Sequence, residues 1–169
     1  FISGHFNNFE LMAMEIEKAG INLCAIYRPL NNLFLNVIME KIRKKYICNK
    51  QIKKGKSGTR NLINFLKNNY SVALMIDQRV SEGELIKFFG RDARTTTIPA
   101  QLVKKYGCKI IPVYIERHKK THFKLSFKKP IQFEQNISQK QISLELNRIL
   151  EKMILKSPDQ WIWSHNRWK

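Results

Sequence analysis

The sequence predicts an α/β fold with a mainly parallel or mixed central sheet flanked by helices. Helical and strand periodicities alternate along the chain, as they do when helices connect the strands of a sheet. Two short apolar runs, over 21–27 and 72–76, have the uninterrupted hydrophobicity of buried strands. The chain has 169 residues, of which 43% are hydrophobic, so it can bury one sizeable core. We therefore expect one domain over residues 1–169.

Capping and breaking residues set the expected boundaries in the first half. Asn8 and Gly20 bracket a helical pattern, Pro29 ends the first apolar run, and Asp77 follows the second. The expected elements are, in order, a helix from Asn8 to Ala19, a strand over 21–27, a helix capped by Asn31 or Asn32, a flexible basic loop over 53–58, a helix over 59–68 and a strand over 72–76. The second of these helices has apolar residues at helical spacing: Phe34, Val37, Ile38 and Ile42.

The second half begins with a stretch that has no clear period, residues 78–97. A loop of that length inside a compact domain usually has a function. The elements expected after it are a helix from Thr97 to Gly107, strands over 109–116 and 122–128, and a helix that Ser138 caps and Ser157–Pro158 ends. The last helix carries the clearest apolar stripe, formed by Ile142, Leu146, Ile149, Leu150, Met153 and Ile154.

The chain is strongly basic. It has 31 Lys and Arg against 13 Asp and Glu, a formal net charge of +18, and this favours a polyanionic partner such as nucleic acid, anionic lipid or an acidic carrier protein. Residues 41–60 hold nine basic residues and no acidic one, and residues 117–129 hold six more. The alternative is a compositional bias toward lysine with no partner at all. We expect at least one of the two clusters to bind a partner.

Composition excludes several classes of protein. The longest apolar runs are about five residues, far short of the roughly 20 that span a bilayer. Three scattered cysteines without a Cys-x-x-Cys argue against a disulfide scaffold or a zinc ribbon. The chain opens on Phe1–Ile2 without a Met, which resembles the end of a strand. We therefore expect that an N-terminal part, with any membrane anchor, is missing.

His5 is the first candidate for chemistry. If it lies in the turn before the first helix, Glu10 could accept a hydrogen bond from one ring nitrogen and leave the other as a base. The alternative is a loop histidine and a glutamate favoured only by the helix dipole. Arg28, Asp77 and Arg79 each follow an apolar strand, at the edge where open α/β sheets place their ligands. We expect His5, Arg28 and Asp77 to converge at one rim of the sheet.

The C-terminal segment alternates aromatic and basic residues: Trp161, Trp163, His165, Arg167, Trp168 and Lys169. Such a segment suits a membrane interface or a stacking surface for nucleic acid. It equally suits a tail that packs back on the core. The sequence leaves these alternatives open.

Six short motifs follow one another along almost the whole chain. They are Gly4-His-Phe-Asn-Asn-Phe-Glu10, Tyr27-Arg-Pro29, Asp77-Gln-Arg79, Phe88-Phe-Gly90, Thr95-Thr-Thr-Ile-Pro99 and Trp161-Ile-Trp-Ser-His-Asn-Arg-Trp-Lys169. This ordered set resembles the bacterial lipid A biosynthesis acyltransferases of the lauroyl and myristoyl type, within the wider His-x4-Asp/Glu superfamily and its glycerolipid-acyltransferase-like fold. Two positions depart from the family pattern: Asn7 stands where many members have Gly, and Lys87 where Pro often precedes Phe-Phe-Gly.

The resemblance implies transfer of a fatty acyl chain from an acyl carrier protein thioester to a hydroxyl of a lipid A precursor. It implies that His5 is the general base and Glu10 its orienting partner. The implied substrate-binding residues are Arg28, Asp77, Gln78, Arg79, Phe88, Phe89 and Gly90. The implied location is the cytoplasmic face of the bacterial inner membrane.

The positive charge indicates a docking partner, and the absence of one motif indicates the reaction route. We expect Lys53, Lys54 and Lys56 to dock the acidic carrier protein or the anionic membrane surface. The chain has no Gly-x-Ser-x-Gly elbow, so direct attack by the acceptor hydroxyl is more natural than an acyl-enzyme. This chemistry requires no cofactor and no metal.

Two other interpretations remain. The same chemistry could serve another lipid or glycolipid acceptor, although the Phe-Pro-Glu-Gly-Thr motif of glycerolipid acyltransferases is absent. A non-catalytic nucleic-acid-binding domain would explain the charge but not the ordered motifs. Because no nucleic-acid-binding signature is evident, we expect no nucleic acid partner.

Overall fold

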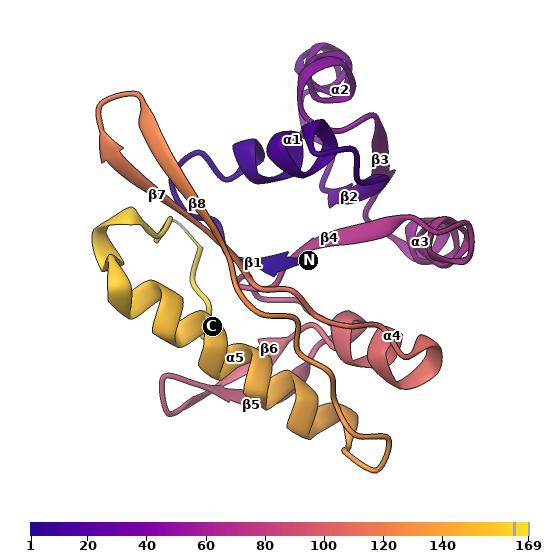
Figure 1. Ribbon diagram of the computed structural model, residues 1–169, viewed down its shortest axis with the longest axis vertical. Coiled ribbons are helices and arrows are strands. Elements are labelled where there is room, and N and C mark those ends of the chain that lie inside the picture. Colours follow the sequence, from indigo (N-terminus) through magenta and orange to yellow (C-terminus); the bar gives the residue numbers. More distant parts are fainter. Residues whose placement is uncertain (164, 169) are drawn as a thin grey trace. The chain divides into compact units, whose positions relative to one another are not determined.

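The computed structural model describes residues 1–163 and 165–168, apart from the side chain of Lys56. By its internal contacts the chain divides into two compact units (Figure 1). Unit 1 comprises Phe1–Asn8 and Met75–Lys169, and unit 2 comprises Phe9–Leu74. That the two act as one domain stays a prediction.

Unit 2 is built on a small parallel sheet. Strand β2 (Leu23–Tyr27) pairs in parallel with β3 (Lys50–Lys53) and with β4 (Ser71–Met75). Helix α1 (Glu10–Lys18) precedes these strands, and α2 (Leu33–Tyr46) and α3 (Lys56–Lys67) connect them. The interior is apolar and includes Met12, Ile16, Leu23, Cys24, Cys48, Ile52 and Leu62.

The boundaries in unit 2 follow from local chemistry. The Asn32 side chain accepts a hydrogen bond from the Leu35 backbone N–H at 3.1 Å, so it caps α2 as predicted. The predicted cap of the first helix is wrong, because Phe9 precedes α1 and no side chain caps it.

The expected loop over 53–58 is also wrong. Strand β3 runs through Lys53, and α3 begins at Lys56. Gly58 permits this tight join, since a Cβ there would lie 2.0 Å from the Lys53 carbonyl oxygen. The basic composition suggested a solvated loop, but the chain turns directly from strand into helix.

Unit 1 combines two antiparallel hairpins with two helices. Its elements are β1 (Ile2–Ser3), β5 (Glu84–Phe88), β6 (Arg91–Thr95), α4 (Ile98–Tyr106), β7 (Val113–Lys119), β8 (His122–Phe127), α5 (Gln139–Lys156) and a short 3-10 helix (Pro158–Gln160). Figure 1 shows α5 running beside the β5–β6 hairpin. The chain thus has the predicted mixed α/β fold. None of the helices in the described residues is long and apolar enough to cross a membrane.

Sequence signals placed both helices of unit 1 well. Gly107 ends α4 with a left-handed φ of 64°, and Ser138 forms a capping box with Gln141 at the start of α5. The buried side of α5 carries the expected stripe, including Ile142, Leu146 and Leu150.

The prediction of a structureless stretch over 78–97 is wrong for most of its length. Strands β5 and β6 pair there in register, with Phe88 opposite Arg91. Phe89 and Gly90 form the two-residue turn between them, with φ values of 49° and 73°. Two consecutive positive φ values are those of a type I′ turn, whose twist suits a hairpin.

Strand β1 fixes the chain just before His5. The Ile2 N–H donates to the Ile111 carbonyl at 3.0 Å, and the Ser3 carbonyl accepts from the Ile76 N–H at 2.9 Å. The Ser3 hydroxyl donates to the Val113 carbonyl at 2.6 Å. His5 and Asp77 each follow one of two backbone segments that are hydrogen-bonded to each other, so the two residues lie side by side.

Candidate active site

His5 and Asp77 are in direct contact. The His5 backbone N–H donates to Asp77 Oδ2 at 2.8 Å, and His5 Nδ1 lies 2.7 Å from Asp77 Oδ1. An ionised carboxylate only accepts hydrogen bonds, so Nδ1 carries the proton and Nε2 presents a lone pair. The structure thus brings together two of the three residues expected at one rim.

The Asp77 carboxylate is buried and accepts from a third donor. Its side chain is 2% exposed, against 19% for His5, and Trp161 Nε1–H donates to Asp77 Oδ2 at 2.9 Å. Burial by itself raises the pKa of the Asp77 carboxyl, but hydrogen bonds from His5 and Trp161 outweigh burial and hold the pKa below its usual value. Asp77 is therefore ionised at neutral pH.

The turn after His5 depends on two small or permissive residues. Gly4 packs against Leu150 and Phe6, because a Cβ there would lie 3.0 Å from Leu150 Cδ1. Asn7 has a φ of 43°, in the left-handed region that Gly favours and Asn tolerates. Asn7 thus keeps the backbone shape that a glycine would give at the position where the sequence departs from the family pattern.

The C-terminal segment packs back along the His5 turn. The Ile162 N–H donates to the His5 carbonyl, and the Asn7 N–H donates to the Gln160 carbonyl, both at 2.9 Å. Trp161 is 4% exposed. Of the alternatives that the sequence left open, the structure has the tail against the core.

Arg167 anchors this segment from inside. It is fully buried, donating to the Arg94 carbonyl and to Thr95 Oγ1, both at 2.6 Å, and its guanidinium lies 5.1 Å from the centre of the Phe88 ring. Burial lowers its pKa to about 10, against the opposing effect of Asp77, so it stays charged at neutral pH. Ser164 and Lys169 lie outside the described residues.

His165 is a second imidazole near Asp77. Its Nε2 accepts from the Arg79 backbone N–H at 3.0 Å. Burial lowers the pKa of His165, and the Asp77 charge only partly opposes this. His165 and Trp161 are not among the predicted site residues, although both lie in the aromatic and basic C-terminal segment that is the last of the six motifs.

The remaining predicted residues of unit 1 lie in different environments. Gln78 and Arg79 are exposed. Phe88 is fully buried beside the rings of Trp161 and Trp168. The neighbouring Phe89 backbone N–H donates to Glu151, and Gly90 is exposed in the same turn. Substrate binding by these residues stays a prediction.

The predicted site residues of unit 2 are Glu10 and Arg28. Glu10 pairs with Arg43, whose terminal nitrogen lies 2.6 Å from its carboxylate. Arg28 is exposed at the end of β2. Because Glu10 and Arg28 lie in unit 2 and His5 in unit 1, their part in one site stays a prediction.

The lysines predicted to dock a partner are also in unit 2. Lys54 is exposed, and Lys53 lies 3.2 Å from the Glu40 carboxylate. That carboxylate accepts hydrogen bonds from Tyr27 and Asn36, which with Lys53 lower the pKa of Glu40 to about 2. The side chain of Lys56 is outside the described part of the chain.

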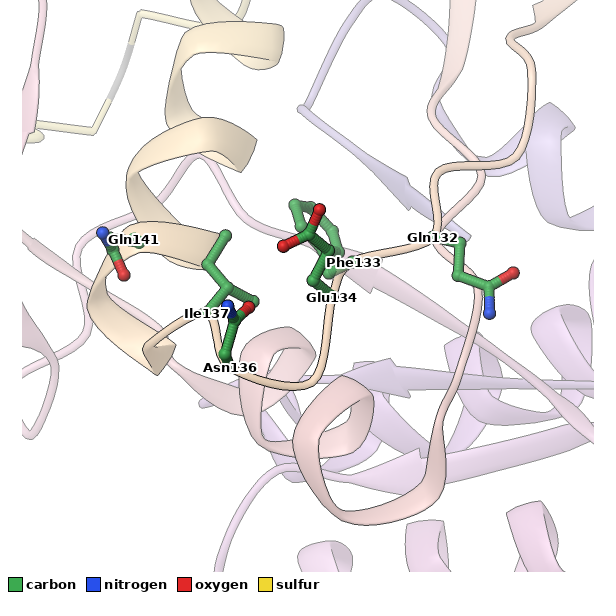
Figure 2. A pocket seen from close by; sticks show the side chains of 6 residues that line it. All are labelled: Gln132, Phe133, Glu134, Asn136, Ile137 and Gln141. Atoms are coloured by element: carbon green, nitrogen blue, oxygen red, sulfur yellow. The ribbon is translucent and has the colours of Figure 1, made fainter.

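A pocket of about 430 Å³ lies at the start of α5 (Figure 2). Its lining residues are Gln132, Phe133, Glu134, Asn136, Ile137 and Gln141. Figure 2 shows that it draws them from the loop before the helix and from the first turn. None of them is a predicted site residue. In the part of the chain that the structure describes, no group of three or more His, Cys, Asp or Glu side chains could hold a metal ion.

The three cysteines are poor nucleophiles. Burial raises the pKa of Cys24 to about 12 and that of Cys48 to about 11, and it also raises the pKa of Cys108. All three thiols are therefore protonated at neutral pH, where a thiolate would be the reactive form.

A histidine whose Nδ1–H is held by a buried carboxylate has the arrangement of a general base. Comparison with known proteins places the chain in a family. Residues 1–169 match the model of the bacterial lipid A biosynthesis acyltransferases, and the chain belongs to that family.

Two curated relatives have the same degree of similarity. The chain is 25% identical over 165 residues to the lipid A biosynthesis palmitoleoyltransferase of Escherichia coli (strain K12) and to a lipid A biosynthesis acyltransferase of Shigella flexneri. The match covers 94% of this chain and 53% of each relative. The chain thus spans about half the length of the curated relatives it matches.

Proposed function

We propose that the protein transfers a fatty acyl chain from an acyl carrier protein thioester to a hydroxyl of a lipid A precursor, with His5 as the general base. The observation that carries the proposal is the contact between His5 Nδ1 and the buried Asp77 carboxylate. With the Nδ1 proton directed at Asp77, the basic lone pair of the imidazole is on Nε2. Membership of the family supplies the reaction class.

The step is a direct transfer. His5 Nε2 removes the proton from the acceptor hydroxyl while the oxygen attacks the thioester carbonyl, forming a C–O bond. The tetrahedral intermediate collapses, the C–S bond breaks, and the imidazolium returns the proton to the leaving thiolate. The products are an ester and a thiol. The protonated state of the three cysteines supports this route over an acyl-enzyme.

Asp77 is proposed to orient the imidazole and to stabilise the imidazolium that forms. Its three hydrogen-bond donors keep it ionised in a buried setting, where its charge acts strongly on the ring. Glu10 remains a second proposed partner of His5, as the family resemblance implies. Arg28, Gln78 and Arg79 are proposed to contact substrate.

The basic cluster supports a charged partner. We propose that Lys53, Lys54 and Lys56 dock the acidic carrier protein or the anionic surface at the cytoplasmic face of the inner membrane. Exposure of Lys54 favours this role, whereas Lys53 is in part neutralised by Glu40.

Transfer of a radiolabelled acyl chain from acyl carrier protein tests the proposal. The purified protein is expected to label a lipid A precursor and not a lysophospholipid or a glycolipid offered in parallel. Labelling of another lipid only would keep the chemistry and change the acceptor. No transfer to any acceptor by folded protein would overturn the proposal.

A further inference from the structure

Helix α2 exposes its large apolar residues, whereas an ordinary surface helix buries them. Its outer side carries large apolar residues: Leu33, Phe34, Leu35, Val37, Ile38 and Ile42. Phe34 is 86% exposed and Leu33 is 79% exposed. No residue of the helix is buried. An exposed apolar patch of this size marks a surface that meets another apolar phase.

The inward side of α2 is mostly polar, and Met39 is its one half-buried apolar residue. Asn36 and Arg43 are half-buried there, and the Asn36 side chain donates to Glu40 at 2.7 Å. Glu40 also accepts from the Tyr27 hydroxyl at 2.6 Å, and Arg43 pairs with Glu10. The helix is thus held to unit 2 by hydrogen bonds and ion pairs, which leaves its other apolar residues to face outward.

Lysines follow the apolar residues along the same side of the helix. Phe34, Val37 and Ile38 are each followed seven residues later by a lysine, namely Lys41, Lys44 and Lys45. Seven residues are two turns, so each lysine lies on the side of its apolar counterpart, about 10 Å along the axis. All three lysines are exposed.

We propose that α2 docks into an anionic lipid bilayer with its N-terminal half buried at the level of the acyl chains. The lysines of its C-terminal half then lie at the phosphate level, since interfacial helices bury their apolar side only about 5–10 Å deep. This α2 surface, defined by Leu33, Phe34, Val37, Ile38, Lys41, Lys44 and Lys45, is distinct from the proposed catalytic residues. The inference goes beyond the proposed acyl transfer and is tested without turnover.

Charge favours a bilayer over a second copy of the chain. Two copies that paired through this surface would bring their lysines together, within a stretch over 41–60 that has no acidic residue. Like charges at an interface oppose association. An anionic bilayer matches both parts of the surface, because its interior accepts the apolar half and its phosphates accept the lysines.

Co-sedimentation with vesicles tests the proposal. The wild-type protein is expected to bind vesicles of phosphatidylethanolamine mixed with phosphatidylglycerol more tightly than vesicles of phosphatidylcholine. The double variant Leu33→Ser, Phe34→Ser should lower the partition coefficient by roughly 10- to 100-fold. Leu155→Ser is the matched control, since Leu155 is 66% exposed on another helix, and it should bind like wild type. Equal binding by the double variant and wild type would overturn the proposal.

The lysine half of the surface has a separate signature. Lys44→Gln and Lys45→Gln should each weaken binding to the anionic vesicles roughly fivefold at low salt, because each basic residue near such a surface contributes about that much. High salt should remove this difference but not the defect of the double apolar variant. Lysine substitutions that change nothing at low salt would contradict the assigned orientation.

Depth and self-association complete the test. A fluorophore attached at Phe34→Cys, in a Cys108→Ser background, should be quenched by lipids that carry a nitroxide on the acyl chain. The same label at Leu155→Cys should not be quenched. In sedimentation equilibrium without vesicles the protein should be a monomer. A wild-type dimer that the double variant dissociates would overturn the proposal in favour of pairing between copies.

Discussion

The imidazole of His5 is held by a carboxylate 72 residues away in the chain, with 2.7 Å between His5 Nδ1 and Asp77 Oδ1. A second hydrogen bond, from the His5 backbone N–H, fixes the carboxylate against the main chain. The ring therefore has one orientation and one tautomer in this arrangement. Both properties are needed by a base that must meet a substrate hydroxyl repeatedly in the same place.

Replacing His5 with alanine should remove the proposed base. Turnover at saturating donor and acceptor should fall roughly 10²–10⁴-fold, the usual contribution of general-base catalysis. The protein should remain folded by circular dichroism, since the His5 side chain is only half-buried. His122→Ala, an exposed histidine on β8, is the control and should keep full turnover. Turnover by His5→Ala close to wild type would eliminate His5 as the base.

Asp77→Asn separates the two carboxylates offered as partners of His5. An amide can donate as well as accept, so it can hold the wrong tautomer, and kcat should fall on the order of 10²-fold or more. Glu10→Gln should also lower kcat, but by a smaller factor, if Glu10 only assists. Steady-state kinetics on both variants, with folding checked by thermal unfolding, shows which variant loses more kcat. A larger loss in Glu10→Gln than in Asp77→Asn would reverse the roles assigned to the two residues.

Trp161→Phe should weaken the hold on Asp77 while keeping the aromatic packing. A hydrogen bond to a charged group contributes about 1.5–3 kcal/mol, so kcat should fall modestly and the protein should be less stable. The control is Trp163→Phe, because Trp163 Nε1–H donates to the Pro158 carbonyl and not to Asp77. Equal kinetics in the two variants would show that the Trp161 hydrogen bond has no part in positioning.

The same variant has a pH signature. The folded Asp77 pKa is below its usual value of 3.8, so the unfolded chain binds more protons near that pH. Asp77 therefore contributes stability that is complete above pH 3.8 and is lost as pH falls through the folded pKa. Losing the Trp161 donor raises the folded pKa, and the acid-dependent loss of unfolding free energy should become smaller. Urea unfolding at a series of pH values around and below 3.8 measures this loss in Trp161→Phe and in wild type. The same pH dependence in both proteins would contradict the assigned hydrogen bond from Trp161 to Asp77.

Arg167→Ala should destabilise unit 1 by roughly 2–4 kcal/mol. It removes two charge-assisted hydrogen bonds and the packing of the guanidinium on Phe88. Chemical denaturation measures the change. Arg148→Ala is the control, since Arg148 is exposed and pairs with Glu145 three residues earlier, and it should change stability by less than about 0.5 kcal/mol. A small effect at Arg167 would mean that the tail is anchored by its tryptophans.

Charge reversal of the proposed docking lysines should act on binding and not on chemistry. The triple variant Lys53→Glu, Lys54→Glu, Lys56→Glu should raise the KM for acyl carrier protein at low salt, and added salt should reduce the difference from wild type. Lys140→Glu with Lys152→Glu, exposed positions on α5, is the control. An unchanged KM at low salt would leave compositional bias as the explanation of the cluster.

The sequence predicted the helices and the buried strands better than the hairpin. Ser138 and Gly107 carry capping signals that depend only on near neighbours, and the structure has both caps. Strand β5 exposes Lys87 and buries Phe88, so its alternation is only five residues long and mixes charge with apolar side chains. Such a short period is difficult to distinguish from a loop, so the sequence predicts no strand over residues 84–95.

Two features of the site and surface depended on long-range contacts. The contact of Trp161 with Asp77 spans 84 residues, and no local pattern encodes it. The apolar residues of α2 have helical spacing whether they face inward or outward. Only the polar contacts of Glu40 and Arg43 show which side of the helix meets unit 2.

The sequence separation of the contacts around Asp77 has a consequence for the newly made chain. Asp77 is synthesised 72 residues after His5, and Trp161 another 84 residues after Asp77. The Asp77 carboxylate can therefore gain its third hydrogen-bond donor only after Trp161 has left the ribosome. A chain that stops before Trp161 is therefore expected to hold the Asp77 carboxylate with the two His5 hydrogen bonds alone.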